Sequence, residues 1–146
     1  MNALPRTMRP ILSALLATAV MSFASYASLA NAQEAKVMLS GDQEVPPVQT
    51  AAKGSGTISV GADMSVTGTI TTTGVDGSMA HVHEAPPGQN GKVVIPLTKS
   101  GDGAWTVPPG KKLTDAQYKA FKAGNLYVNV HSAAHQGGEI RGQIKP

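Results

Sequence analysis

The chain has 146 residues, with twelve Lys and Arg, nine Asp and Glu, and no cysteine. The basic residues form no run with interleaved aromatic residues, which argues against nucleic-acid binding. The absence of cysteine excludes disulfides, thiolate metal ligands and a cysteine nucleophile.

The N-terminal segment has the pattern of a secretory signal. Arg6 and Arg9 precede an apolar run over residues 11–24, and Ala30–Ala32 has the small-x-small form of a cleavage site. The run is short for a membrane span, which needs about 20 residues. We therefore predict a signal peptide over residues 1–32, with an uncleaved N-terminal anchor as the alternative.

Removal of this segment leaves residues 33–146, which is enough for one domain with a single core. Ten Lys and Arg against nine Asp and Glu give this part a formal charge of only +1. The prediction is a secreted or periplasmic domain that has no nucleic-acid partner and no membrane contact once the signal is removed.

Short strands alternate with turns along the predicted domain. Aliphatic residues alternate with threonine and other polar residues, which is typical of sheets with one face in water. Pro46 and Pro47 exclude regular pairing around them, and Pro96 places its strand near a sheet edge. The predicted strands cover residues 35–39, 54–60, 64–73, 78–84, 92–97, 103–107, 126–131 and 139–144.

One helix is predicted over residues 115–123. Thr114 and Gln117 have the spacing of a capping box, and Gly124 suits the position just after a helix. Together these elements predict an all-β fold, an antiparallel Greek-key-like β-sandwich of about seven or eight strands with one short helix.

All four histidines lie in two pieces of the chain. His81 and His83 are two residues apart on one strand, so their side chains share a face. His131 lies on the non-aliphatic side of its own strand, with Tyr127 and Asn129, and His135 follows in a turn. If the two strands are neighbours, cross-strand Cβ atoms are about 5 Å apart and the imidazoles can converge.

Imidazoles without thiolate or clustered carboxylates suit Cu(II) or Zn(II). We predict His81, His83, His131 and His135 as metal ligands, with copper first because it leads the affinity order for nitrogen sites, and zinc as the alternative. The competing interpretation is an exposed His-x-His strand that is merely polar surface. Residues that could orient the rings are Glu84, Asn129, Glu139 and Gln143.

The remaining polar residues receive structural interpretations. Glu139 and Arg141, two apart on one strand face, predict a surface ion pair of small energetic value. Asp42 and Glu44 are expected in solvent, and Trp105 is expected to pack in the core or at its rim. No nucleophile, base and orienting carboxylate are placed together, so the sequence does not predict a hydrolase.

Three stretches resemble the CHRD domain, the family named after chordin. They are LSGDQEVPPVQTAAKGSGTISV, AHVHEAPPGQNGKVVIPL and LTDAQYKAFKAGNLYVNVHSAAHQGGEIRGQI, and together they span residues 39–144. The resemblance implies a secreted β-sandwich, and it says less about biochemical function.

The HVHE strand alone is similar to the metal-binding strand of copper/zinc superoxide dismutases. The likeness implies His81 and His83 as the strand pair and His131 as the later ligand. The chain departs from those enzymes because it has no cysteine for their disulfide and no long zinc loop, and Arg141 lies in a different local sequence.

Three functions therefore remain open. The first is an exported copper-binding protein in metal handling or tolerance. The second is an extracellular protein-interaction module whose histidines are incidental. The third is a dismutase-like oxidoreductase, although the sequence favours a protein that is not an enzyme.

Overall fold

The computed structural model describes residues 32–146, and the predicted signal peptide lies outside them except for its last residue. Within the described part, no helix has the length and apolar character needed to cross a membrane.

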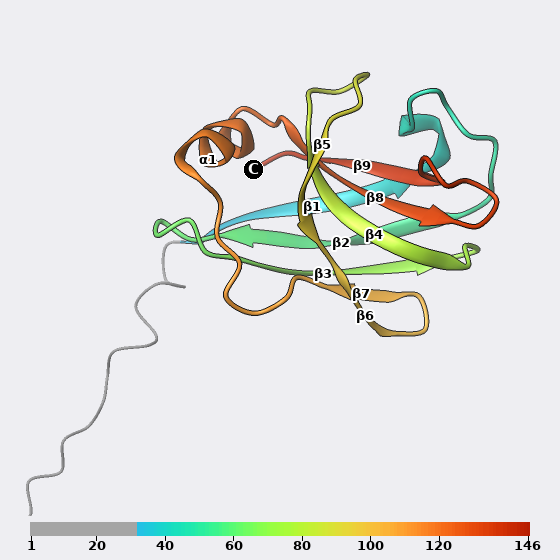
Figure 1. Cartoon of the computed structure of the whole chain (residues 1–146), viewed down its shortest axis with the longest axis horizontal. Coiled ribbons are helices and arrows are strands. Elements are labelled where there is room, and N and C mark those ends of the chain that lie inside the picture. Colours follow the sequence, from blue (N-terminus) through green and yellow to red (C-terminus); the bar gives the residue numbers. More distant parts are fainter. Residues whose placement is uncertain (1–31) are drawn as a thin grey trace, which may run out of the picture.

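The described residues form nine strands and one α-helix (Figure 1), which confirms an all-β antiparallel fold with one short helix. The strand over residues 98–101 lies outside every predicted range, because its four residues are all exposed and show no aliphatic alternation. In chain order the elements are β1 (Gln33–Ser40), the 3-10 turn η1 (Gly41–Gln43), β2 (Lys53–Val60), β3 (Val66–Thr73), β4 (Gly77–Glu84), β5 (Lys92–Pro96), β6 (Thr98–Gly101), β7 (Ala104–Thr106), α1 (Asp115–Lys122), β8 (Leu126–Ser132) and β9 (Ile140–Ile144).

The strands form one sheet in the order β5-β4-β8-β9-β1-β2-β3-β7-β6, and every pairing is antiparallel. Its two edge strands, β5 and β6, follow each other directly in the chain. Between them, Leu97 donates its amide N–H to the carbonyl of Ala80 on β4 (2.9 Å). The sheet is therefore nearly closed on itself, and few edge groups are left for pairing with other chains.

Curling of this sheet produces two facing layers, with β4 and β5 crossing in front of β2 and β3 in Figure 1. The aliphatic side of each strand points between the layers, as the alternation in the sequence predicts. Val37, Ile58, Ile70, Val82 and Val128 are each at most 1% exposed.

Helix α1 begins as the sequence predicts. The Thr114 hydroxyl accepts from the Gln117 amide (3.2 Å), and the Gln117 side chain accepts from the Thr114 amide (2.9 Å). Gly124 follows the helix with a positive φ of 74°, a conformation that glycine adopts without strain. Phe121 is fully buried and anchors the helix on the core.

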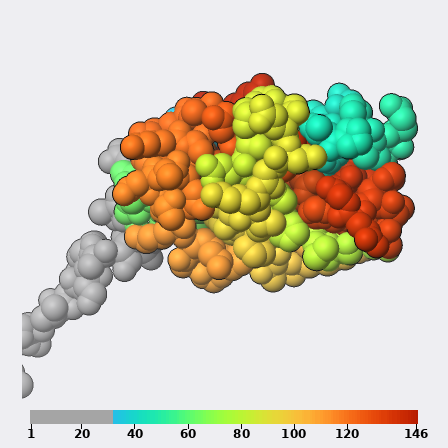
Figure 2. All heavy atoms as spheres, turned by 45° about the horizontal axis from the view of Figure 1, so that its top comes forward, coloured from blue at the N-terminus to red at the C-terminus, as the bar shows by residue number. Residues whose placement is uncertain are grey.

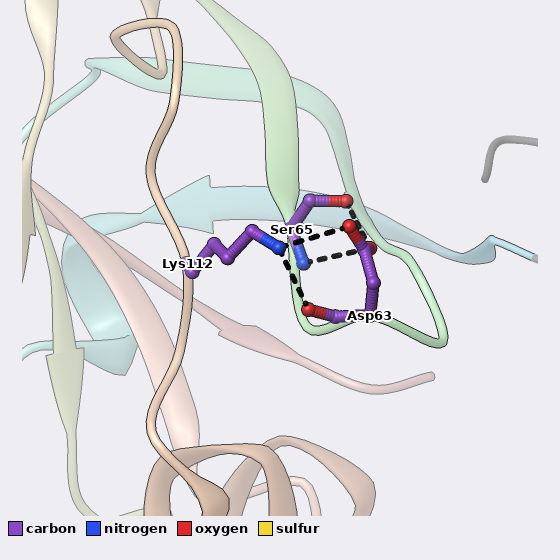
Figure 3. Close-up of polar contacts among 3 residues, drawn as sticks. All are labelled: Asp63, Ser65 and Lys112. Atoms are coloured by element: carbon purple, nitrogen blue, oxygen red, sulfur yellow. Dashed lines mark hydrogen bonds and ion pairs between the residues drawn. The ribbon is translucent and has the colours of Figure 1, made fainter. Parts of the chain in front are cut away.

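The turn between β2 and β3 is held by one carboxylate (Figure 3). Asp63 accepts hydrogen bonds from the amide and hydroxyl of Ser65, and its other oxygen lies 3.1 Å from the Lys112 ammonium. These contacts, the Ser65 hydroxyl foremost, lower the pKa of Asp63 to about 2. The contact fixes the segment that leads into α1 against this end of the sheet.

The outer sides of the two layers differ. On β3 the outward threonines, residues 67, 69, 71 and 73, are exposed, as the sequence predicts for a wet face. The outer side of β8 is instead buried along its whole length. Figure 2 shows the cyan segment after β1 lying against the red C-terminal segment, and the Thr50 hydroxyl donates to Glu139 there (2.8 Å).

Candidate metal centre

The site arises from the pairing of β4 with β8. In this antiparallel pair His81 lies opposite Asn129, His83 opposite Tyr127, and Met79 opposite His131. Residues opposite each other point to the same face, so the histidines of both strands lie together. The two histidine-bearing strands are neighbours, which is the condition on which the predicted convergence of the imidazoles depends.

Three imidazoles converge on the outer face of the pair. His81, His83 and His131, which we call the histidine triad, each offer one ring nitrogen within 4.8 Å of the others. Nδ1 of His81 is 3.0 Å from Nε2 of His131. Nitrogens bound to one ion at about 2.0–2.1 Å lie about 2.8–3.4 Å apart at angles of about 90–109°, so this spacing suits shared coordination.

A loop and an aromatic ring hold His83 in place. Its Nδ1 is 3.0 Å from the carbonyl oxygen of Gly91, and its ring stacks on Tyr127 with centroids 4.9 Å apart and planes 9° from parallel. The Tyr127 hydroxyl accepts in turn from the Gly91 amide (3.1 Å). Because a carbonyl oxygen can only accept, Nδ1 carries the proton and Nε2 keeps its lone pair.

His131 is fixed in the same tautomer. Its Nδ1 donates to the carbonyl oxygen of Gln136 (2.8 Å), in the turn after β8, so Nε2 is unprotonated and accepts a hydrogen bond from Nδ1 of His81 (3.0 Å). Backbone carbonyls are common orienting partners of metal-binding histidines, because they fix the ring and raise its basicity.

Burial favours the uncharged forms of His81 and His83. Desolvation is the main cause that lowers the pKa of both His81 and His83, and the neighbouring His131 adds repulsion between positive charges. For His83, the Gly91 carbonyl and Asn129 act in the opposite direction without outweighing burial. Neutral imidazole is the form that binds metals.

Arg141 is a correction to the sequence interpretation. It was expected on the surface, paired with Glu139, but it is 1% exposed and bonds to other groups. Its guanidinium donates to the carbonyls of Gln89 (2.7 Å) and Pro86 (3.2 Å), and lies 3.6 Å from the centre of the Tyr127 ring. Arg141 therefore holds the loop after β4 in place and packs against the Tyr127 ring that stacks on His83.

Glu44 and Glu139 are also buried, at 4% and 8% exposure. The prediction that Glu44 lies in solvent was therefore wrong, whereas Asp42 is exposed as predicted. Glu44 accepts from the side-chain amide of Asn129 (3.0 Å), and burial raises the pKa of its carboxyl. Glu139 accepts from the hydroxyls of Thr50 and Ser132. These carboxylates hold the covering loops against β8.

Of the predicted orienting residues, Asn129 lies between the triad and Glu44. Glu84 instead pairs with Lys92 at 3.6 Å, and Gln143 bonds to Arg141. His135 is outside the histidine triad. It lines a separate hollow of about 270 Å³ with Glu44 and Gly138.

The family model of the CHRD domain matches residues 35–144. The chain belongs to the CHRD domain family. No curated protein and no solved structure gives a significant match. CHRD domains are typically extracellular, and the all-β fold agrees with the resemblance found in the sequence.

The donor set of this CHRD domain fits a metal ion. Nε2 of His83 is buried and has no hydrogen-bond partner within residues 32–146. A buried lone pair without a partner is costly, and a metal ion at the triad would satisfy it. The half-buried His81 leaves one side of the triad open to solvent.

Sequence reasoning missed the residues that position the rings. Tyr127 was expected only as a polar-side residue, and nothing marked Gly91 or Gln136, which act through their backbone carbonyls. The close approach of Gly91 leaves no room for a side chain, since a Cβ there would clash with the carbonyl oxygen of Glu84.

Proposed function

We propose that this CHRD-domain protein binds one transition-metal ion, copper in the first place, through His81 Nδ1, His83 Nε2 and His131 Nε2. The observation that carries the proposal is the buried, unpartnered Nε2 of His83 within the described residues, in a group whose ligand atoms lie within 4.8 Å of one another. The fixed tautomers of His83 and His131 support it, because both rings keep Nε2 unprotonated. An ion at the triad would replace the proton that Nδ1 of His81 donates to Nε2 of His131.

Copper is favoured by the chemistry of the donors. Three neutral imidazoles form a nitrogen site, and Cu²⁺ leads the divalent first-row ions in affinity for such sites. Zn²⁺ accepts the same ligands with tetrahedral geometry and is the alternative. Either ion would leave one position for water or a further ligand on the solvent side of His81.

The proposed role is metal handling outside the cytoplasm, as a carrier, scavenger or tolerance factor. The secretory pattern of residues 1–32 and the extracellular setting of the family support this location. The position of the site also supports storage or transfer, because an ion beside the half-buried His81 could be reached by a partner protein.

The test is a titration of the purified protein over residues 33–146 with Cu(II) and with Zn(II), monitored by calorimetry and by competition with a chelator. We expect one equivalent to bind to the wild type, and His83→Gln and His131→Gln to weaken binding by about 100-fold, since each removes one of three ligands. Loss of affinity on acidification should begin below pH 6.5, because burial lowers the pKa of His81 and His83.

His135→Gln is the matched control, because it removes a histidine that lies outside the triad. Its affinity should equal that of the wild type. Binding that is unchanged in His83→Gln, or lost equally in His135→Gln, would contradict the proposed site.

Membership of the CHRD family favours a second candidate function, an extracellular protein-interaction module. A wild-type protein that gives no heat and no thermal shift with either ion would favour that role. The dismutase alternative has less support, because Arg141 is engaged by backbone carbonyls and Tyr127.

A further inference from the structure

A methionine lies next to the histidine triad on the same face of the sheet. Met79 is two residues before His81 on β4 and directly opposite His131 on β8. Alternation along β4 buries Ala80 and Val82 in the core and places Met79, His81 and His83 on the outer face. Directly opposed residues have Cβ atoms about 4.5–5.5 Å apart, so Met79 begins within reach of the triad.

The exposure of Met79 is unusual for its residue type. Its side chain is 50% exposed, and only Met38 and Val93 join it as exposed large hydrophobic residues in the described part of the chain. Methionine is normally among the residues most often buried. A half-exposed methionine beside an open side of the triad is therefore free to turn toward it, since its side chain has three rotatable bonds.

We propose that the Met79 thioether is the fourth ligand of the triad and raises the affinity of the copper site for Cu(I). The inference rests on the proposed metal site. A thioether is a soft donor that favours Cu(I), whereas Zn(II) and Cu(II) gain little from it beside three imidazoles. Backbone carbonyls hold the rings of His83 and His131, Tyr127 stacks on His83, and the flexible sulfur would complete the site from the solvent side.

The exposed side of this site also indicates which kind of partner could take the metal ion from the protein. A thioether at the rim can leave the metal without moving the sheet, because Met79 is not packed into the core. The partner chemistry that fits is a soft sulfur or imidazole donor on another copper carrier, which would replace Met79 first and the more buried nitrogens later.

The experiment measures Cu(I) affinity under anaerobic, reducing conditions by competition with a chromophoric Cu(I) chelator, using the protein over residues 33–146. Met79→Leu should lower the Cu(I) affinity by about tenfold or more, because it removes the soft donor and keeps the volume. It should change the Zn(II) affinity by less than about twofold. The Cu(I) X-ray absorption spectrum should lose its sulfur scatterer in this variant.

Met38→Leu is the matched control. Met38 is 68% exposed on β1, a strand separated from β8 by β9 in the sheet order. Its Cu(I) affinity and sulfur scattering should match those of the wild type. Both substitutions replace exposed methionine on a strand, so neither is expected to disturb folding, and thermal unfolding verifies this.

The outcomes separate this inference from the proposed function. Unchanged Cu(I) affinity in Met79→Leu, with loss of metal in His83→Gln, overturns the role of Met79 and leaves the triad intact. Unchanged metal binding in His83→Gln and His131→Gln overturns the proposed function and this inference with it. Equal losses in Met79→Leu and Met38→Leu overturn the assignment of the sulfur to Met79.

Discussion

The outer side of β2 and β3 and the outer side of β8 and β9 are both polar, but only the first is exposed to water along most of its length. On β3, threonines 67, 69, 71 and 73 are exposed, so their hydroxyls need no hydrogen-bond partner from the protein. On β8 and β9, the polar residues Asn129, His131 and Arg141 are at most 7% exposed beneath two loops.

The difference shows where the fold carries an energetic cost. Burial of a polar group costs free energy unless each donor and acceptor finds a partner. Most groups on the covered side are partnered, often by backbone carbonyls of the covering loops, and the buried lone pair of His83 is an exception within residues 32–146. A surface with so many buried polar groups is expected at a functional site. The threonine side carries no such cost, because water satisfies its hydroxyls.

The largest effect of a substitution on the free energy of unfolding is expected at Arg141, on the covered side. Arg141→Met should lower the free energy of unfolding by about 3 kcal/mol, because the carbonyls of Gln89 and Pro86 lose a charged donor in a buried place. Thr69→Val, on the exposed side, should change it by less than about 0.5 kcal/mol. Urea unfolding measures both, and equal small effects would show that the covered side is not a stabilising network.

A substitution at Gly91 tests whether the loop after β4 holds the His83 ring in place. Gly91→Ala should cost about 2 kcal/mol, because its Cβ would clash with the carbonyl oxygen of Glu84. It should also weaken metal binding by displacing the carbonyl that orients His83. Gly137→Ala is the control, since a Cβ there meets no described atom within 4 Å, and a similar loss in both variants would contradict this role of the loop.

Tyr127→Phe removes one hydrogen bond and keeps the stacked ring. The Gly91 amide would lose its acceptor, so the free energy of unfolding should fall by about 1 kcal/mol. Tyr118→Phe on α1 is the matched control, and it should change stability by only a few tenths of a kcal/mol, as is usual away from such contacts. A reversed order of the two effects in denaturant unfolding would refute the role given to the Tyr127 hydroxyl.

The smallest expected effect is a change in the pH dependence of stability. In the metal-free protein, burial lowers the folded pKa of His83 below its ordinary value of 6.5, so the unfolded chain binds more protons between the two values. The free energy of unfolding should therefore fall as the pH is lowered from about 6.5, and level off below the folded pKa.

His83→Gln should show a shallower fall in that pH window when both proteins are unfolded in urea with a chelator present. The raised pKa of Glu44 acts with the opposite sign, but both proteins share it and the comparison removes it. Identical slopes in the two proteins would mean that His83 is not titrated differently on folding.

The sequence carried the information for the core and for the face of each strand on which the histidines lie, but the pairing of β4 with β8 that brings them together came from the structure. Alternation fixes which side of β4 and β8 is aliphatic, and the His-x-His spacing then places two rings on the other side. The capping box of α1 was also predicted correctly, because it depends on residues only three apart. These features are local, or follow from a period of two.

The burial of the outer side could not be predicted from such patterns. Glu44, Glu139 and Arg141 look like surface residues in a strand or loop, and only the path of the loops over β8 buries them. His135 shows the same limit, because its turn directs it toward Glu44 and away from the histidine triad. Coverage by distant segments leaves no periodic signal in the residues that are covered.

The most direct test of the metal centre is nitrogen NMR of the histidine rings, recorded with and without one equivalent of Zn(II), which is diamagnetic. The account predicts that Nδ1 of His81, Nε2 of His83 and Nε2 of His131 shift together to the resonance range of metal-bound nitrogen, while both ring nitrogens of His135 stay unchanged. Shifts at His135 equal to those of the triad, or no shift at Nε2 of His83, would contradict it.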